Sequence, residues 1–134
     1  MKFILTIAVA VLSACSAFAA NTYWVDKDNP NASDGNPGTQ ALPFRTINAA
    51  ANNPNIAAND TINVMPGIYN EGGQADPQSG IFNRVYLPVK VVLHAVEGRS
   101  NTVIVGARDP NSADAHGRGP NAVRCIYEIG RAHV

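Results

Sequence analysis

Beyond residue 52 the sequence offers only short β-prone runs, and no segment between them has a helical period. Parallel sheets of α/β proteins need helical crossovers, and β-sandwiches favour tight hairpin turns; neither signal is present. Short strands joined by polar loops of unequal length favour a solenoid, in which each turn of the chain buries one face against the next. The sequence therefore predicts an all-β fold. Strands are expected at Thr22–Val25, Thr61–Met65, Phe82–Leu87, Val89–Val96, Thr102–Val105 and Ala122–Tyr127.

Alternation within these runs predicts which side chains face the core. Ile62 and Val64 share one face of the run that begins at Thr61. In the last run Val123 and Cys125 are expected inward and Arg124 outward. Cys125 is thus interpreted as a small core residue.

One short helix is expected between the first strand and the second. Thr46–Asn52 suits one or two helical turns, with Pro54 ending them. Ile47, Ala50 and Ala51 fall on one side at helical spacing. An apolar face that narrow suits a short helix that covers the end of another structural element.

The first residues have the charge, length and small-residue site of an export signal. Residues 1–19 read as a signal peptide cut after Ala17-Phe18-Ala19. In the alternative, Leu12–Cys15 is a bacterial lipobox and Cys15 carries a lipid. Either interpretation places the protein outside the cell or at its surface, by bacterial-type export and with no transmembrane segment in the mature chain.

The last residues, Glu128–Val134, resemble the translation of a common sequencing adapter. The alternative is a genuine polar C-terminus. If the adapter interpretation holds, residues 128–134 are an artefactual tail and carry no function. The expected organisation is then a signal peptide at 1–19, one domain at 20–127 and this tail.

The charge of the predicted domain limits its partners. Residues 20–127 contain eight Lys and Arg against nine Asp and Glu, a net charge of −1. This balance predicts no nucleic-acid partner, and no basic run points to an anionic membrane.

Four ordered blocks carry a family resemblance: Tyr23–Asp26, Asp34–Thr39, Pro43–Ile47 and Asp60–Tyr69. Together they resemble the N-terminal module of secreted right-handed parallel β-helix proteins, the pectate-lyase-like superfamily. The resemblance implies a β-helix (solenoid) whose open end is capped by the short helix, which hides edge-strand N–H and C=O groups. It also implies that further coils normally follow, so that this chain is a truncated fragment.

The resemblance implies two functions for the full-length parent. One is a lyase or glycoside hydrolase acting on uronate-rich polysaccharide; the alternative is a non-enzymatic, adhesin-like surface β-helix. Lyases of this kind use an Arg or Lys base with calcium, and the hydrolases use clustered carboxylates. Neither constellation can be matched here, so the catalytic residues are expected beyond Tyr127, the fragment itself is expected to be inactive, and calcium remains a candidate cofactor of the parent.

Few residues of the chain itself are candidates for catalysis. Lys90 and His94 are expected on the outward face of one strand, four residues apart. Asp114 and His116 share a polar loop with Asp109 and Arg118, where a carboxylate and an imidazole could hold a metal or a sugar acid. Ordinary solvent-exposed residues give the same sequence pattern at both candidate sites.

A candidate calcium site follows the first strand, where Asp26, Asp28 and Asp34 lie in a loop rich in turn-forming residues. A plain structural loop has the same composition.

Other polar and aromatic residues are interpreted as structural. Arg45 and Arg84 are expected to bond loop carbonyls. The aromatic residues expected in the cap and core are Tyr23, Trp24, Tyr69 and Tyr86.

Overall fold

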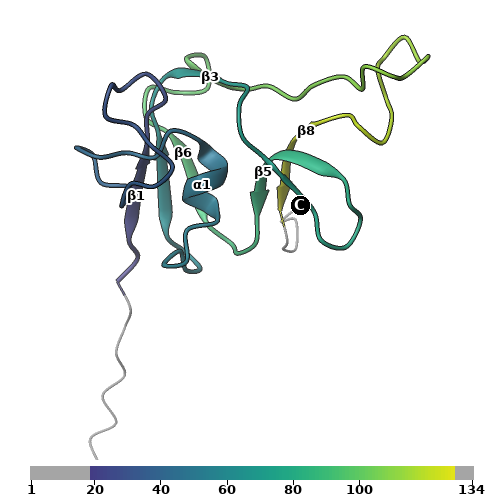
Figure 1. Cartoon of the computed structure of the whole chain (residues 1–134). Helices are drawn as coiled ribbons and strands as arrows, with labels where there is room; N and C mark the ends of the chain where they lie inside the picture. Colours follow the sequence, from purple (N-terminus) through teal and green to yellow (C-terminus); the bar gives the residue numbers. More distant parts are fainter. Residues whose placement is uncertain (1–18, 129–134) are drawn as a thin grey trace, which may run out of the picture.

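The structure, a computed structural model, describes residues 19–128 (Figure 1). The lipobox, most of the predicted signal peptide and residues 129–134 lie outside the described residues. Within them the fold is all-β, with three small sheets, one five-residue helix and no closed barrel. No helix in this range is long and apolar enough to cross a membrane. The elements are β1 (Thr22–Val25), α1 (Ile47–Ala51), β2 (Thr61–Val64), β3 (Gly67–Tyr69), β4 (Gln74–Ala75), β5 (Phe82–Leu87), β6 (Val92–Ala95), β7 (Thr102–Ile104) and β8 (Arg124–Glu128).

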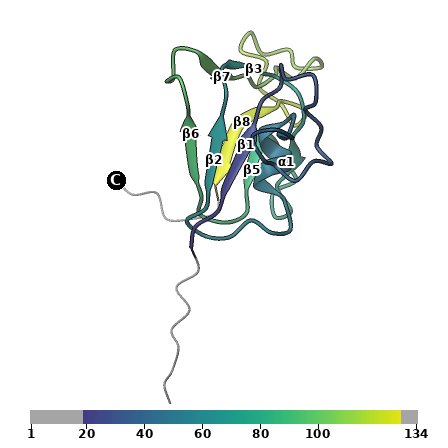
Figure 2. The ribbon, with the colours of Figure 1, turned by 90° about the vertical axis from the view of Figure 1, so that its left-hand side faces the viewer.

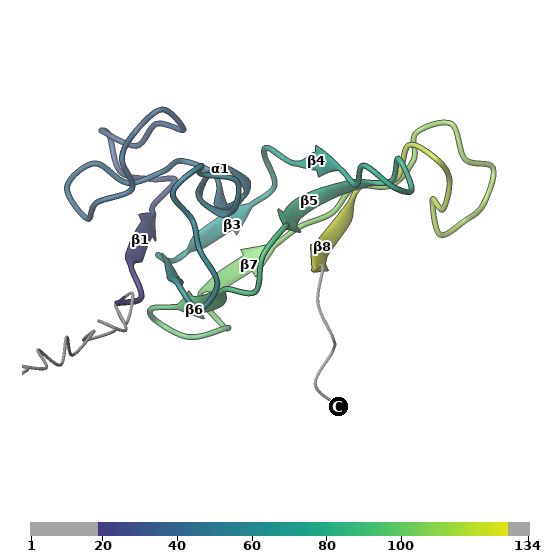
Figure 3. The ribbon, with the colours of Figure 1, turned by 90° about the horizontal axis from the view of Figure 1, so that it is seen from below.

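The chain visits the three sheets twice in the same order. Strands β2, β3 and β5 are followed by β6, β7 and β8, and each strand of the second set pairs in parallel with its counterpart in the first. Figure 2 shows β1, β2 and β6 side by side, and Figure 3 shows β7 beside β3 and β8 beside β5. The partners at the start of each pair are Thr61 with Val92, Gly67 with Thr102, and Asn83 with Arg124.

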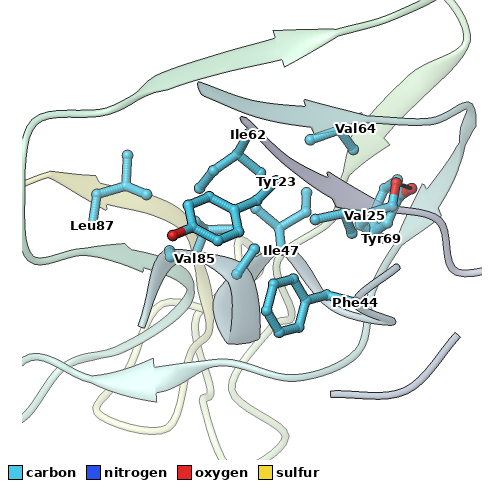
Figure 4. Packing of buried hydrophobic residues seen from close by; sticks show 11 residues of the cluster. Tyr23, Val25, Phe44, Ile47, Ile62, Val64, Tyr69, Val85 and Leu87 are labelled. Atoms are coloured by element: carbon cyan, nitrogen blue, oxygen red, sulfur yellow. Dashed lines mark hydrogen bonds between the residues drawn. The ribbon is translucent and has the colours of Figure 1, made fainter. Parts of the chain in front are cut away.

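The core lies between the sheets and α1 (Figure 4). Ile62 and Val64 of β2 are 0% and 2% exposed, which confirms the predicted inner face. In register with them, β1 contributes Tyr23 and Val25. Because paired residues of a parallel sheet point to the same side, apolar side chains stack from strand to strand. Burying each such side chain stabilises the fold by about 1.5–3 kcal/mol.

Helix α1 packs its predicted face, Ile47, Ala50 and Ala51, into this core. Asn48, near the start of α1, and Asn52, the residue that follows it, reach the backbone of Tyr86 in β5 with their side chains. The Tyr86 N–H donates to Asn48 Oδ1 at 3.1 Å, and Asn52 Nδ2 donates to the Tyr86 carbonyl at 3.2 Å. These two amides supply the hydrogen bonds that a neighbouring strand would otherwise make at this edge.

The outer edge of β1 is covered as well. The Trp24 N–H donates to the Gly38 carbonyl at 2.8 Å, and the Phe44 N–H donates to the Trp24 carbonyl at 2.9 Å. The loop between β1 and α1 therefore satisfies the backbone of β1. A β-carbon on Gly38, whose φ is +77°, would lie 2.3 Å from Phe44 Cε2, so the close approach needs glycine.

The predictions for β8 and for the segment before β5 were wrong. In β8, which is an edge strand, Ile126 pairs with the buried Val85 and lies on the same side of the sheet, although Ile126 is itself 44% exposed. Cys125 lies on the other side and is exposed rather than buried. The other face of β8 is fixed by Tyr127, whose ring stacks on Tyr86 with centroids 5.9 Å apart. The pairing therefore shifts the inward set by one residue, which exchanges the two faces.

The second error concerns a hairpin. Residues 70–80, where the sequence predicts no strand, contain β4, which pairs antiparallel with β5. The turn is built on Asp76, whose carboxylate accepts from the N–H groups of Gln78 and Ser79 and from the Ser79 hydroxyl. A strand of two residues is too short to show any period.

Candidate functional site

The three calcium candidates do not form one group: Asp34 and Asp26 bond the backbone, and Asp28 pairs with a lysine. Asp34 accepts from the N–H groups of Arg45 and Thr46, at 3.1 and 2.8 Å, and from the Thr46 hydroxyl at 3.0 Å. It therefore holds the start of α1. Asp26 accepts from the Asp28 N–H, and Asp28 pairs with Lys27. Within residues 19–128 no three His, Cys, Asp or Glu side chains are grouped to hold a metal ion.

Lys90 and His94 do not share a strand. Strand β6 begins at Val92, because the chain bends at Pro88 and Val89, and Lys90 lies before it. Its carbonyl accepts from the Asn59 N–H at 2.8 Å. His94 is in β6 and exposed, so the two side chains are not positioned by one pleated surface.

The structure places His94 in a different constellation, on the outer face of β1, β2 and β6. Trp24, Asn63 and His94 occupy the same register position in the three strands. His94 Nδ1 lies 2.9 Å from Asn63 Oδ1. Trp24 is half-buried, whereas Tyr23, Tyr69 and Tyr86 are buried as predicted. We call Trp24, Asn63 and His94 the outer row.

A second site lies between β7 and β8, in the loop that contains Asp114 and His116. Ala107 and Val123 close its base through two backbone hydrogen bonds of 2.9 and 2.8 Å. Asp109, which is 5% exposed, organises its interior by accepting from the N–H groups of Asn111 and Asn121. These hydrogen bonds lower the pKa of the Asp109 carboxyl, against the opposing effect of burial.

This loop forms a hollow of roughly 520 Å³. Its charged lining consists of Arg108, Arg118 and Arg124, with His116 beside them, and no carboxylate lines it. Asp114, the other candidate, accepts from the His116 N–H at 3.1 Å and lies 3.9 Å from Arg118 Nε. The arrangement is suited to binding an anion. We call this site the arginine hollow.

Arg108 and Arg124 are not among the site residues that the sequence predicts. Alternation places Arg124 on the outward face of a strand, and Arg108 stands in a polar loop. The one sequence signal for this site is the alternation of glycine and arginine at Gly117–Gly119. Such glycines indicate that the backbone packs closely next to a charged side chain. The expected structural role of Arg84 is confirmed, since its guanidinium donates to the carbonyls of Val105 and Gly72. Arg45 instead lies 3.6 Å from Glu71.

Comparison of the chain with models of protein families, with curated proteins and with solved structures finds no match.

Proposed function

We propose that this chain is the N-terminal part of an extracellular right-handed parallel β-helix protein that binds polysaccharide. The parallel pairing of β2, β3 and β5 with β6, β7 and β8 supports such a coil, as does the covering of β5 by α1. The resemblance to pectate-lyase-like proteins supplies the class of ligand. The parent is then a lyase or hydrolase of uronate-rich glycans, with an adhesin-like surface protein as the alternative.

The outer row is the observation that carries the binding function. Neighbouring strands lie about 4.8 Å apart, so the three side chains form a flat, regularly spaced strip. The indole of Trp24 offers a rigid apolar face to a sugar ring, and the polar groups of Asn63 and His94 can bond its hydroxyls.

The first test uses the fact that Trp24 is the only tryptophan of the chain. Titration with oligogalacturonate or with a neutral oligosaccharide should change its fluorescence if a sugar stacks on it. By calorimetry, Trp24→Ala should weaken binding about tenfold, whereas Trp24→Phe should retain most of it. Phe82→Ala is the matched control, because Phe82 is 39% exposed and lies in another sheet. Unchanged fluorescence with every polysaccharide, or equal losses for Trp24→Ala and Phe82→Ala, would refute the proposal.

A second test separates the enzyme from the adhesin. Release of unsaturated uronate by a longer form of the protein, followed by absorbance with and without calcium, supports the lyase. Release of saturated oligosaccharides supports the hydrolase. Retained polysaccharide binding without either product supports the adhesin-like alternative.

A further inference from the structure

We propose that the arginine hollow is a binding site for an oxyanion carried by a sugar, either a carboxylate or a sulfate ester. Figures 1 and 3 place the loop between β7 and β8 at the end of the molecule away from β1. The site is therefore separate from the outer row. That a sugar carries the anion rests on the proposed function, whereas the binding of an anion does not.

The charge balance of the hollow points to an anion. Three arginine residues line it, and an arginine side chain stays charged at every accessible pH. Of the nearest acidic groups, Asp109 is engaged by backbone N–H groups and Asp114 pairs with one arginine only. Asp109 is turned into the loop, where Asn111 and Asn121 occupy its carboxylate. Among the described residues, Arg118 is the only lining arginine with an ion pair, a loose one at 3.9 Å from Asp114.

Backbone contacts hold Arg108 in place and shape the loop. Arg108 Nη1 donates to the Ala115 carbonyl at 3.2 Å, which leaves its other N–H groups for a ligand. Gly117 has φ +66°, and a β-carbon there would lie 2.5 Å from Arg108 Cβ. A β-carbon on Gly119 would lie 2.1 Å from Asp109 Oδ2. Both glycines are therefore needed for the loop to close around the hollow.

The chemistry of arginine narrows the class of ligand. A guanidinium presents parallel N–H groups that match the two oxygens of a carboxylate or of a sulfate. The volume, roughly 520 Å³, lies within the range of small-molecule sites. A monosaccharide carrying one such group satisfies both conditions, and a neutral sugar of the same size satisfies only the second.

The test is calorimetric titration of the full chain with three monosaccharides: galacturonate, a galactose sulfate and neutral galactose. The variants are Arg108→Ala and Arg108→Lys. The matched control is Arg99→Ala, because Arg99 is an exposed arginine outside the hollow and its loss changes net charge equally. Circular dichroism and thermal unfolding of each variant establish that it is folded.

The expected result is binding of a charged sugar that weakens with added salt. Arg108→Ala should reduce the affinity at least tenfold, Arg108→Lys should recover only part of it, and Arg99→Ala should leave it unchanged. Binding of galacturonate alone identifies a carboxylate ligand, and binding of the sulfate alone identifies an ester; either supports the site. Equal binding of neutral galactose, no binding of either charged sugar, or equal losses for Arg108→Ala and Arg99→Ala would overturn it.

Trp24 keeps this test distinct from that of the proposed function. A ligand in the arginine hollow should leave the fluorescence of Trp24 unchanged, because the two sites lie at different ends of the molecule. Monosaccharide binding that depends on Arg108, without a response from Trp24 to any polysaccharide, would uphold the hollow and reject the outer row.

Discussion

Replacing Asn48 with alanine tests whether α1 works as a substitute for a neighbouring strand. The Tyr86 N–H that donates to Asn48 Oδ1 belongs to a residue only 5% exposed. Without the amide this donor is buried and unsatisfied, which costs about 1–3 kcal/mol. Alanine is the better helix former by roughly 0.5 kcal/mol, which offsets part of the loss. We expect the free energy of unfolding to fall by about 1–2 kcal/mol.

Asn48→Asp is the matched control because it keeps the acceptor oxygen. Its negative charge near the start of α1 is also favourable, by roughly 0.3–1 kcal/mol. Urea unfolding followed by Trp24 fluorescence measures both variants. With a denaturant slope of about 1–2 kcal/mol per molar, Asn48→Ala should lower the midpoint by about 1 M, and Asn48→Asp should leave it nearly unchanged.

Hydrogen exchange at the Tyr86 amide locates the effect. In Asn48→Ala this amide should exchange faster, relative to the other amides of β5, than it does in the parent chain. Equal destabilisation by the two substitutions, or unaltered protection of Tyr86, would refute the edge-covering role of α1.

Three further predictions follow from burial. Ile62→Ala, at a fully buried site, should lower the free energy of unfolding by about 2–5 kcal/mol, whereas Ile68→Ala, at a side chain 57% exposed, should change it by less than about 0.5 kcal/mol; thermal unfolding distinguishes them. Cys125 should react with an aromatic disulfide reagent in the native chain without denaturant, and a reaction that needs urea would contradict its exposure. Burial, reinforced by Asp26 and Asp28, raises the pKa of Tyr69 to about 12. The unfolded chain therefore loses that proton first, so stability should fall as the pH rises from about 10 towards 12; ultraviolet titration of Tyr69→Phe against the parent chain measures this contribution.

Local chemistry was sufficient to predict an element wherever the segment contains its own sequence signal. Strand β5 has the predicted bounds, because Phe82–Leu87 is a β-prone run between a glycine-ended loop and Pro88. Helix α1 was predictable because Thr46 caps it, accepting from the Ala49 N–H at 3.2 Å. The alternation that turns Ile62 and Val64 inward is likewise a property of four consecutive residues.

The features that could not be predicted from the sequence depend on contacts between segments that are distant in the chain. Asp34 is a plain turn residue in the sequence, and only its position beside Arg45 and Thr46 makes it the anchor of α1. The arginine hollow also forms between residues that are distant in the chain. Arg108 and Arg124 line one hollow because Ala107, beside Arg108, pairs with Val123, beside Arg124.

The sequence by itself determined the class of this protein: all-β, with one short helix between the first strand and the second. Those properties follow from local alternation and capping, which act over a few residues. The tertiary structure decided which faces are buried and which charges gather. Ile126 rather than Cys125 lies on the same side of the sheet as the buried Val85 because β8 takes its register from β5, and the pleat reverses a side chain with every residue of shift.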